Sequence, residues 1–116
     1  MAFSPHYNIT GSTGVSVELI APGEDISNIK SILLTNIHAT ATATVTLFIQ
    51  NDPESNGGTT NTFKLLNTVA IPSDTALLLD NQSMLNFNNS GDNSFGLYIT
   101  VGGSDTLDVL INTSIL

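Results

Sequence analysis

The 116-residue chain has no cysteine, no tryptophan and no arginine, and Lys30 and Lys64 are its only basic residues. Without cysteine, disulfide bonds and thiolate metal sites are excluded. Ten acidic side chains give a formal net charge of −8 at pH 7. A surface that binds phosphates needs clustered Lys and Arg side chains. The charge balance therefore argues against nucleic acid as a partner and against electrostatic docking on an anionic membrane.

Long apolar runs are also missing. No segment approaches the roughly 20 apolar residues that a membrane-spanning helix needs, and the first residues lack the basic and apolar regions of a signal peptide. Only 10% of residues are charged, while 41% are hydrophobic, so Thr, Ser and Asn supply most of the polar surface. We therefore expect a soluble, unprocessed chain with a neutral polar surface that is suited to packing against neighbours.

What the sequence does contain is strict alternation of apolar and polar residues, and this pattern is typical of half-buried β-strands. It is clearest near the C-terminus, where Ile99 and Ile111 occupy mid-strand positions on the expected core face. Ile32 and Leu34 are expected in the core for the same reason. We expect an all-β fold of about eight antiparallel strands in a two-sheet, jelly-roll-like sandwich. The predicted strands are 15–19, 29–37, 41–50, 63–71, 75–79, 84–87, 95–101 and 107–115.

The first twelve residues have no period, and we interpret residues 1–12 as an extended N-terminal arm that precedes a β-sandwich domain at 13–116. The apolar residues of the arm are Phe3, Tyr7 and Ile9. Such an arm can lie along its own sheet or along a neighbouring subunit, and the sequence does not choose between them. Because the apolar residues are sparse, we expect removal of the arm to spare the fold.

One loop has part of the spacing of a calcium site. Asp52, Glu54, Asn56 and Gly57 match the start of a loop in which alternate oxygens converge on a cation. Phe63 stands where the bidentate Glu should be, and strands rather than helices flank the loop. The sequence therefore favours an acidic turn without a metal.

Other candidates for chemistry are equally incomplete. His6 and His38 have no second His and no Cys or carboxylate at metal-ligand spacing, so each is interpreted as a turn residue. No Ser lies in a Gly-x-Ser-x-Gly elbow, and no helix follows the glycine-rich turns to form a phosphate site. We expect no catalytic residue, no metal and no cofactor, and hence a protein that is not an enzyme.

Four segments in succession have a recognisable layout. They are Lys-Ser-Ile-Leu-Leu-Thr-Asn at 30–36, an alternating Thr/Val strand at 41–50, Leu-Asn-Thr-Val-Ala-Ile-Pro at 66–72 and Thr-Ala-Leu-Leu-Leu-Asp at 75–80. This layout, which covers the chain from Val15 onward, resembles small β-sandwich virion proteins of tailed bacteriophages. Those proteins coat heads or build parts of tails and fibres, and no catalytic residue comes with the resemblance.

The resemblance implies a non-enzymatic virion structural protein, most simply a capsid decoration or cement protein on the outer head surface, made in the host cytoplasm. A tail, baseplate or fibre subunit is the alternative within this class. A carbohydrate-binding β-sandwich module is the alternative from another class, in which Tyr98 or Phe87 would stack on sugar rings.

The implied partners are the major capsid protein or other virion subunits, together with further copies of the chain. The low charge density favours a homo-oligomer, and a trimer is the expected form. The apolar residues expected at the subunit interface are Phe3, Tyr7, Ile9, Phe48, Tyr98 and Leu110.

Overall fold

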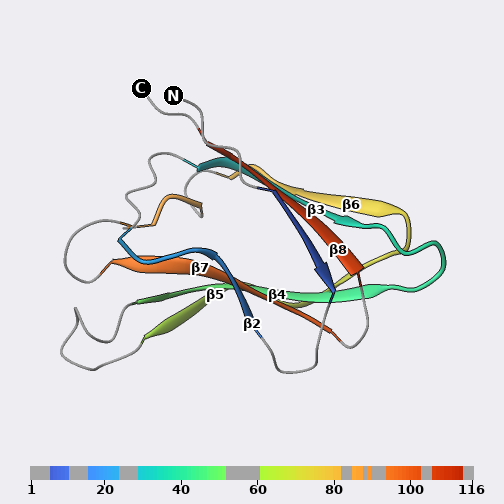
Figure 1. Cartoon of the computed structure of the whole chain (residues 1–116), viewed down its shortest axis with the longest axis horizontal. Coiled ribbons are helices and arrows are strands. Elements are labelled where there is room, and N and C mark those ends of the chain that lie inside the picture. Colours follow the sequence, from blue (N-terminus) through green and yellow to red (C-terminus); the bar gives the residue numbers. More distant parts are fainter. Residues whose placement is uncertain are drawn as a thin grey trace.

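The computed structural model describes residues 6–10, 16–23, 29–51, 61–81, 85–87, 89, 94–102 and 106–113. These residues form eight strands that lie in two layers (Figure 1). The strands are β1 (His6–Thr10), β2 (Ser16–Ile20), β3 (Ile29–Asn36), β4 (Ala43–Asn51), β5 (Thr62–Ile71), β6 (Thr75–Leu79), β7 (Phe95–Val101) and β8 (Thr106–Thr113).

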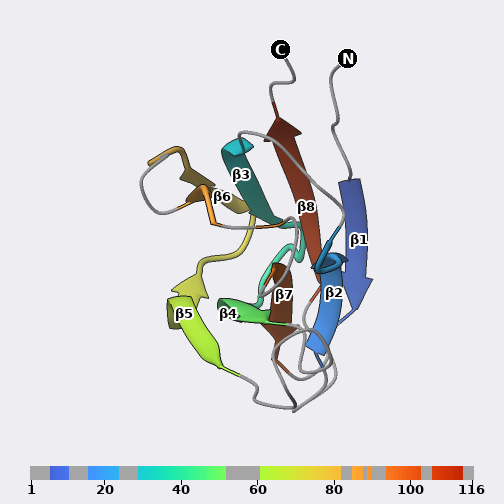
Figure 2. The same cartoon turned by 90° about the vertical axis from the view of Figure 1, so that its left-hand side faces the viewer.

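Two antiparallel sheets face each other, and each has four strands. Their orders are β1-β8-β3-β6 and β2-β7-β4-β5, as the end view in Figure 2 shows. Among the described strands only β4 and β5 are consecutive and paired; every other connection crosses from one sheet to the other. Eight antiparallel strands that alternate between two sheets in this way form a jelly roll, so the predicted fold class is confirmed.

The core lies between the sheets and follows the alternation of the strands. Ile32, Leu34, Ile99 and Ile111 are fully buried, as the period-two pattern predicts. Each of these side chains contributes about 1.5–3 kcal/mol to folding through removal of apolar surface from water. Because both sheets contribute a row of such residues from every central strand, the two layers are held together without any covalent link.

The N-terminal arm lies along its own sheet. Residues 6–10 form β1, which pairs with β8 in an unbroken register from His6 opposite Leu110 to Thr10 opposite Thr106. Ile9 is only 6% exposed and belongs to the core. Of the two positions that the sequence left open for the arm, residues 6–10 take the one along their own sheet. We therefore now expect removal of the arm to destabilise the fold rather than to spare it. Residues 1–5, 11 and 12 lie outside the described residues.

One predicted strand is wrong. The described part of the 84–87 segment is not a strand, and Leu85 instead occupies a short turn that its backbone N–H closes onto the carbonyl of Asn81. The side chain of Leu85 is fully buried in the core cluster. The apolar residues that suggested a strand are explained by this buried position rather than by pairing with a neighbour. The structure still has eight strands, because β1, which the sequence did not predict, takes the place of the predicted 84–87 strand.

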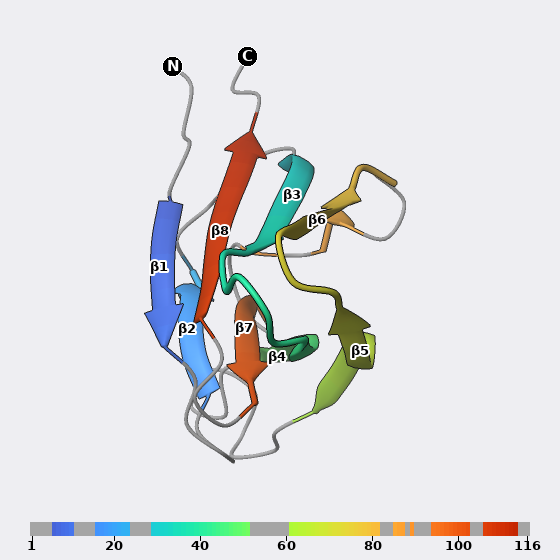
Figure 3. The ribbon, with the colours of Figure 1, turned by 90° about the vertical axis from the view of Figure 1, so that its right-hand side faces the viewer.

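A buried asparagine joins the two turns at one end of the sandwich, which Figure 3 shows face-on. Asn36, at the end of β3, donates hydrogen bonds to the carbonyls of Ala41 (2.8 Å) and Ile71 (2.9 Å) and accepts one from the backbone N–H of His38 (3.0 Å). The backbone N–H of Asp74 bonds the carbonyl of His38. The β3–β4 and β5–β6 crossings are therefore tied to each other.

Candidate functional site

Within the described ranges, no cluster of three or more His, Cys, Asp or Glu side chains is placed to hold a metal ion. His38 lies in the turn after β3, where its Nδ1 accepts hydrogen bonds from the backbone N–H groups of Thr40 and Ala41. The described residues also include no helix long and apolar enough to cross a membrane.

The loop with partial calcium spacing, Asp52, Glu54, Asn56 and Gly57, lies outside the described residues. The expectation that it holds no metal stays a prediction.

The outer face of the β2-β7-β4-β5 sheet has one row of side chains that crosses all four strands. Glu18 on β2 is opposite Tyr98 on β7, Tyr98 is opposite Phe48 on β4, and Phe48 is opposite Lys64 on β5. The rings of Phe48 and Tyr98 stack, with centroids 5.6 Å apart and planes 15° from parallel. The row thus reads acid, aromatic, aromatic, base, and we call it the cross-sheet row.

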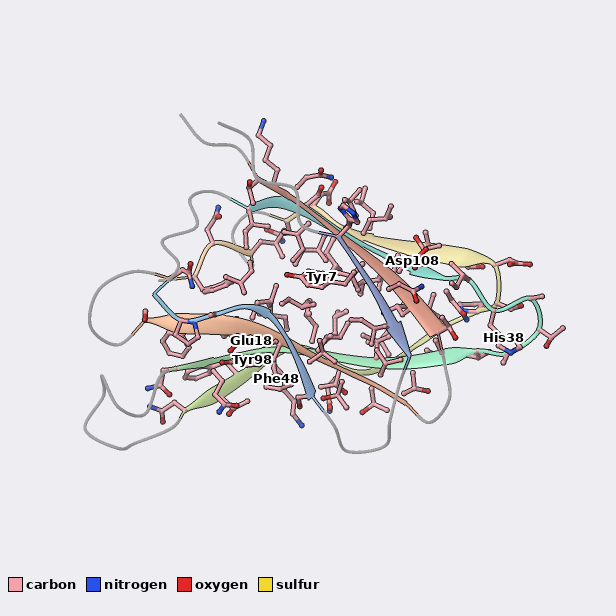
Figure 4. The ribbon with its side chains drawn as sticks, viewed as in Figure 1. Tyr7, Glu18, His38, Phe48, Tyr98 and Asp108 are labelled. Carbon is pink, nitrogen blue, oxygen red and sulfur yellow. The ribbon has the colours of Figure 1, made fainter. Side chains whose placement is uncertain are left out.

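The charged ends of the cross-sheet row are held by their neighbours. The Tyr98 hydroxyl donates a hydrogen bond to Oε2 of Glu18 at 3.1 Å, and Figure 4 shows Glu18, Tyr98 and Phe48 gathered at the same part of the sheet. Lys64 Nζ donates to Oδ1 of Asn67 at 3.5 Å. Three strand spacings of about 4.8 Å separate Glu18 from Lys64, so about 14 Å lies between them and they cannot pair within one molecule.

Polar rows flank the cross-sheet row on both sides. The hydroxyls of Ser16 and Thr100 are 3.0 Å apart on one side, and the Thr62 hydroxyl donates to Gln50 Oε1 at 3.5 Å on the other. An open hollow of about 380 Å³ lies between these rows. Its lining residues are Thr46, Phe48, Gln50, Thr62, Lys64 and Thr100. The face therefore combines an apolar centre with neutral hydrogen-bonding groups.

A bulge in β5 shapes one border of the hollow. The β4–β5 register shifts on either side of Leu47, and Thr68 has a positive φ of 54°, which is strained for a β-branched residue. The backbone N–H of Thr68 donates to the hydroxyl of Thr46 at 3.0 Å. The bulge therefore holds the Thr46 hydroxyl in place through this hydrogen bond. It also brings the Asn67 side chain within reach of Lys64.

The outer face of the β1-β8-β3-β6 sheet is more apolar. Leu110, Leu33 and Leu78 are opposite one another on β8, β3 and β6. In the next row Asn8 Nδ2 donates to Asp108 Oδ1 at 2.7 Å. A second open hollow of about 380 Å³ lies over β1, β8 and β3, and Leu33, Leu110 and Asp108 are among its lining residues.

Among the described residues, one side of the sandwich has an apolar surface that is partly exposed. The edge strands β5 and β6 of the two sheets border it and contact each other, as Figures 2 and 3 show from opposite directions. Phe63 and Leu78 are each 55% exposed; Leu78 is on the outer face of β6, whereas Phe63 is opposite Ile49 at the margin of the core. Four further side chains on these strands are only half-buried against the core, namely Leu65, Leu66, Leu77 and Leu79. We call this surface the open edge.

The residues expected at a subunit interface lie in different surroundings. Ile9 is in the core and has almost no exposed area to offer a neighbour, and Tyr7 is half-buried at the edge of the core. Phe48 is 9% exposed and lies beside the half-buried Tyr98 on one outer face. Leu110 is half-buried on the other outer face, and Phe3 lies outside the described residues. That Phe48, Tyr98 and Leu110 meet a neighbouring subunit stays a prediction.

Sequence reasoning missed the structural asparagines. Besides Asn36, Asn89 is 5% exposed and donates to the carbonyls of Ala21 (3.0 Å) and Phe95 (2.7 Å). Asn51 is 3% exposed and accepts a hydrogen bond from the backbone N–H of Asn61. Each satisfies backbone groups at or near the ends of strands; the bond from the His38 N–H to Asn36 has the spacing of an Asx turn, whereas those of Asn51 and Asn89 join segments farther apart in the sequence. In so Asn-rich a sequence, a position at the end of a predicted strand could have marked Asn36 and Asn51, but no such signal marks Asn89.

Comparison with known proteins gives no relative: no protein-family model, curated protein or solved structure matches the chain. The strand order itself is thus the basis for assigning the fold.

Proposed function

We propose that the protein is a non-enzymatic structural subunit of a tailed-phage virion, a decoration protein that packs on the outer head surface against the major capsid protein and its own copies. The jelly-roll architecture supports this role, because viral capsid domains use it repeatedly. Fold alone does not define function, and lectin domains share the architecture. The proposal therefore rests on a specific surface.

The open edge is the observation that carries the proposal. Edge strands of soluble proteins usually avoid presenting apolar residues to water, because an unpaired apolar strand invites association. β6 has the sequence Thr-Ala-Leu-Leu-Leu, with neither charge nor proline within it. Leu78 on β6 and Phe63 on β5 are both 55% exposed. Burial of these side chains against a capsid surface would stabilise the bound state.

The charge supports the outside of the particle. A subunit with a formal charge of −8 would be repelled by packaged DNA, whereas an outer surface imposes no such cost.

The direct test is mass spectrometry of purified virions, in which the copy number distinguishes a head protein, present in many copies, from a tail or fibre subunit. A binding test follows on capsids that lack the protein. Leu78→Asp should weaken attachment at least about tenfold while leaving the monomer folded, since Leu78 is exposed. Thr42→Asp, which adds the same charge at an exposed turn position, is the matched control. Absence from virions would contradict the proposal.

A carbohydrate-binding module is the second candidate. The hollow beside Phe48 favours it, because hydroxyl, amide and ammonium groups surround an aromatic ring there. A glycan array tests this function, and Phe48→Leu should abolish any signal that arises at the hollow.

A further inference from the structure

We propose that the outer face of the β2-β7-β4-β5 sheet is a two-fold interface that binds a second copy of this chain. The inference deepens the proposed function, because it names one surface through which copies assemble. It rests on the order of charges and rings in the cross-sheet row, which has Glu18 at one end and Lys64 at the other.

The symmetry of the row selects the way in which two copies can meet. When two identical sheet faces are stacked, the two-fold axis lies in the plane between them. An axis parallel to the row would set Glu18 over Glu18 and Lys64 over Lys64. An axis parallel to the strands reverses the row, so Glu18 of each copy lies over Lys64 of the other. This second arrangement forms two intermolecular ion pairs from residues that are too far apart to pair within one copy.

The same axis brings the aromatic residues together at the centre. It sets Tyr98 of each copy over the position of Phe48 in the other, and Tyr98 supplies most of the aromatic contact surface, because Phe48 is only 9% exposed beside it. It also keeps the strands of the two sheets aligned, which is the usual geometry of packed sheets. Aromatic residues at the centre and charges at the rim are the normal arrangement of a protein interface.

Charge complementarity identifies the second copy as the occupant. Glu18 and Lys64 are the only charged residues in β2, β4, β5 and β7, so this face is neutral in a chain whose formal charge is −8. Two copies can therefore approach here without the repulsion that the rest of the chain would produce. The flanking residues on this face, such as Ser16, Thr100 and Gln50, are neutral, and their hydroxyls and amides lose less on burial than charges do.

The trimer expected from the sequence is a different assembly. A pair of faces related by a two-fold axis closes on itself as a dimer, and further growth needs another surface such as the open edge.

Charge reversal tests the interface through measured association, for example by sedimentation or light scattering. Glu18→Lys and Lys64→Glu should each weaken self-association at least about tenfold, because each converts both ion pairs into like-charge contacts. A mixture of the two variants should form heterodimers, because one supplies two lysines and the other two glutamates. The double variant should dimerise like the original chain, since its row is reversed but still complementary.

Matched controls lie in or directly beside strands of the other sheet. Asp80→Lys and Lys30→Glu make the same changes in net charge at exposed positions and should leave the dimer intact. A chain that stays monomeric at hundreds of micromolar would overturn the inference. The inference would also be overturned if the protein formed trimers in solution, if the mixture of Glu18→Lys and Lys64→Glu failed to associate, or if a glycan bound this face of a monomer.

The outcome is separable from that of the proposed function. A monomer that is found in virions and binds capsids through the open edge would remove only this inference. A dimer that is absent from virions would remove only the virion role.

Discussion

The hydroxyl of Tyr7 donates a hydrogen bond to the backbone carbonyl of Leu19. Tyr7 lies on β1, an edge strand of one sheet, and Leu19 lies on β2, an edge strand of the other. The bond therefore joins the two sheets on the side of the sandwich opposite the open edge. It also shows why residues 6–10 belong to the domain: they are paired to β8 within one sheet and bonded to β2 in the other.

Removal of that hydroxyl should have a measurable effect on stability. Tyr7→Phe keeps the ring but leaves the Leu19 carbonyl without this donor, so we expect the free energy of unfolding to fall by about 1 kcal/mol. Urea titration measures the change. Tyr98→Phe is the matched control, since its bond to Glu18 is solvent-exposed and should contribute less than about 0.5 kcal/mol. Equal effects for the two variants would argue against the sheet-to-sheet bond.

Deletion of residues 1–12 should destabilise the isolated domain strongly. The deletion removes β1, uncovers the edge of β8 and takes the buried side chain of Ile9 out of the core. Loss of one such aliphatic side chain alone costs about 2–5 kcal/mol. Thermal melting of the full-length and shortened chains provides the comparison, and an unchanged melting temperature would mean that β1 contributes nothing to stability in solution.

Substitution of Asn36 tests the tie between the two crossings. Asn36→Ala removes two donors and one acceptor at a fully buried position and leaves the carbonyls of Ala41 and Ile71 without these partners. We expect a loss of about 3 kcal/mol, since each buried group without a partner costs roughly 1–3 kcal/mol. Asn8→Ala removes an exposed amide and should cost at most about 0.5 kcal/mol. The reverse order in chemical denaturation would disprove the buried role.

Gly96 has no room for a side chain. A Cβ atom at this position would lie 2.6 Å from the carbonyl oxygen of Ile20 and 2.7 Å from Cδ of Pro22. Gly96→Ala should therefore push β2 away from β7 and cost about 1–3 kcal/mol, as overpacking does. Thr100 lies on the same strand and is half-exposed, so Thr100→Ala should have a smaller effect on stability. A Gly96→Ala variant as stable as the original would show that β2 adjusts freely.

Local pattern was enough to predict most strands and much of the core. Ile32, Leu34, Ile99 and Ile111 lie where alternation places them, because one face of each strand must leave water. The failures occur where tertiary contacts, rather than local pattern, decide the structure. Residues 6–10 have few apolar side chains, and their strand is stabilised by its pairing with distant β8. Leu85 is apolar because it fills the core from a turn, not because it lies in a ladder.

The candidate surfaces could not be predicted in the same way. The cross-sheet row joins Glu18, Phe48, Lys64 and Tyr98, which are far apart in the sequence and meet only through the registers of three strand pairs. Which distant strands pair, and in which register, cannot be read from local alternation alone. The expectation that Phe48 and Tyr98 lie on an outer face followed from alternation alone. Alternation did not predict that the two rings stack or that Glu18 and Lys64 lie at the two ends of the row.

The order β1-β8-β3-β6 places the last strand of the domain between two of the first. During synthesis β3 can pair with β6, but β1 has no partner in its sheet until β8 has been made, so this sheet cannot be completed while residues 106–113 are still inside the ribosome. The β4–β5 hairpin is the only local pairing among the described strands, and it is the natural place for folding to begin. Such high contact order implies slow folding, in milliseconds to seconds, and the chain exposes apolar strand edges to other chains until both sheets are complete.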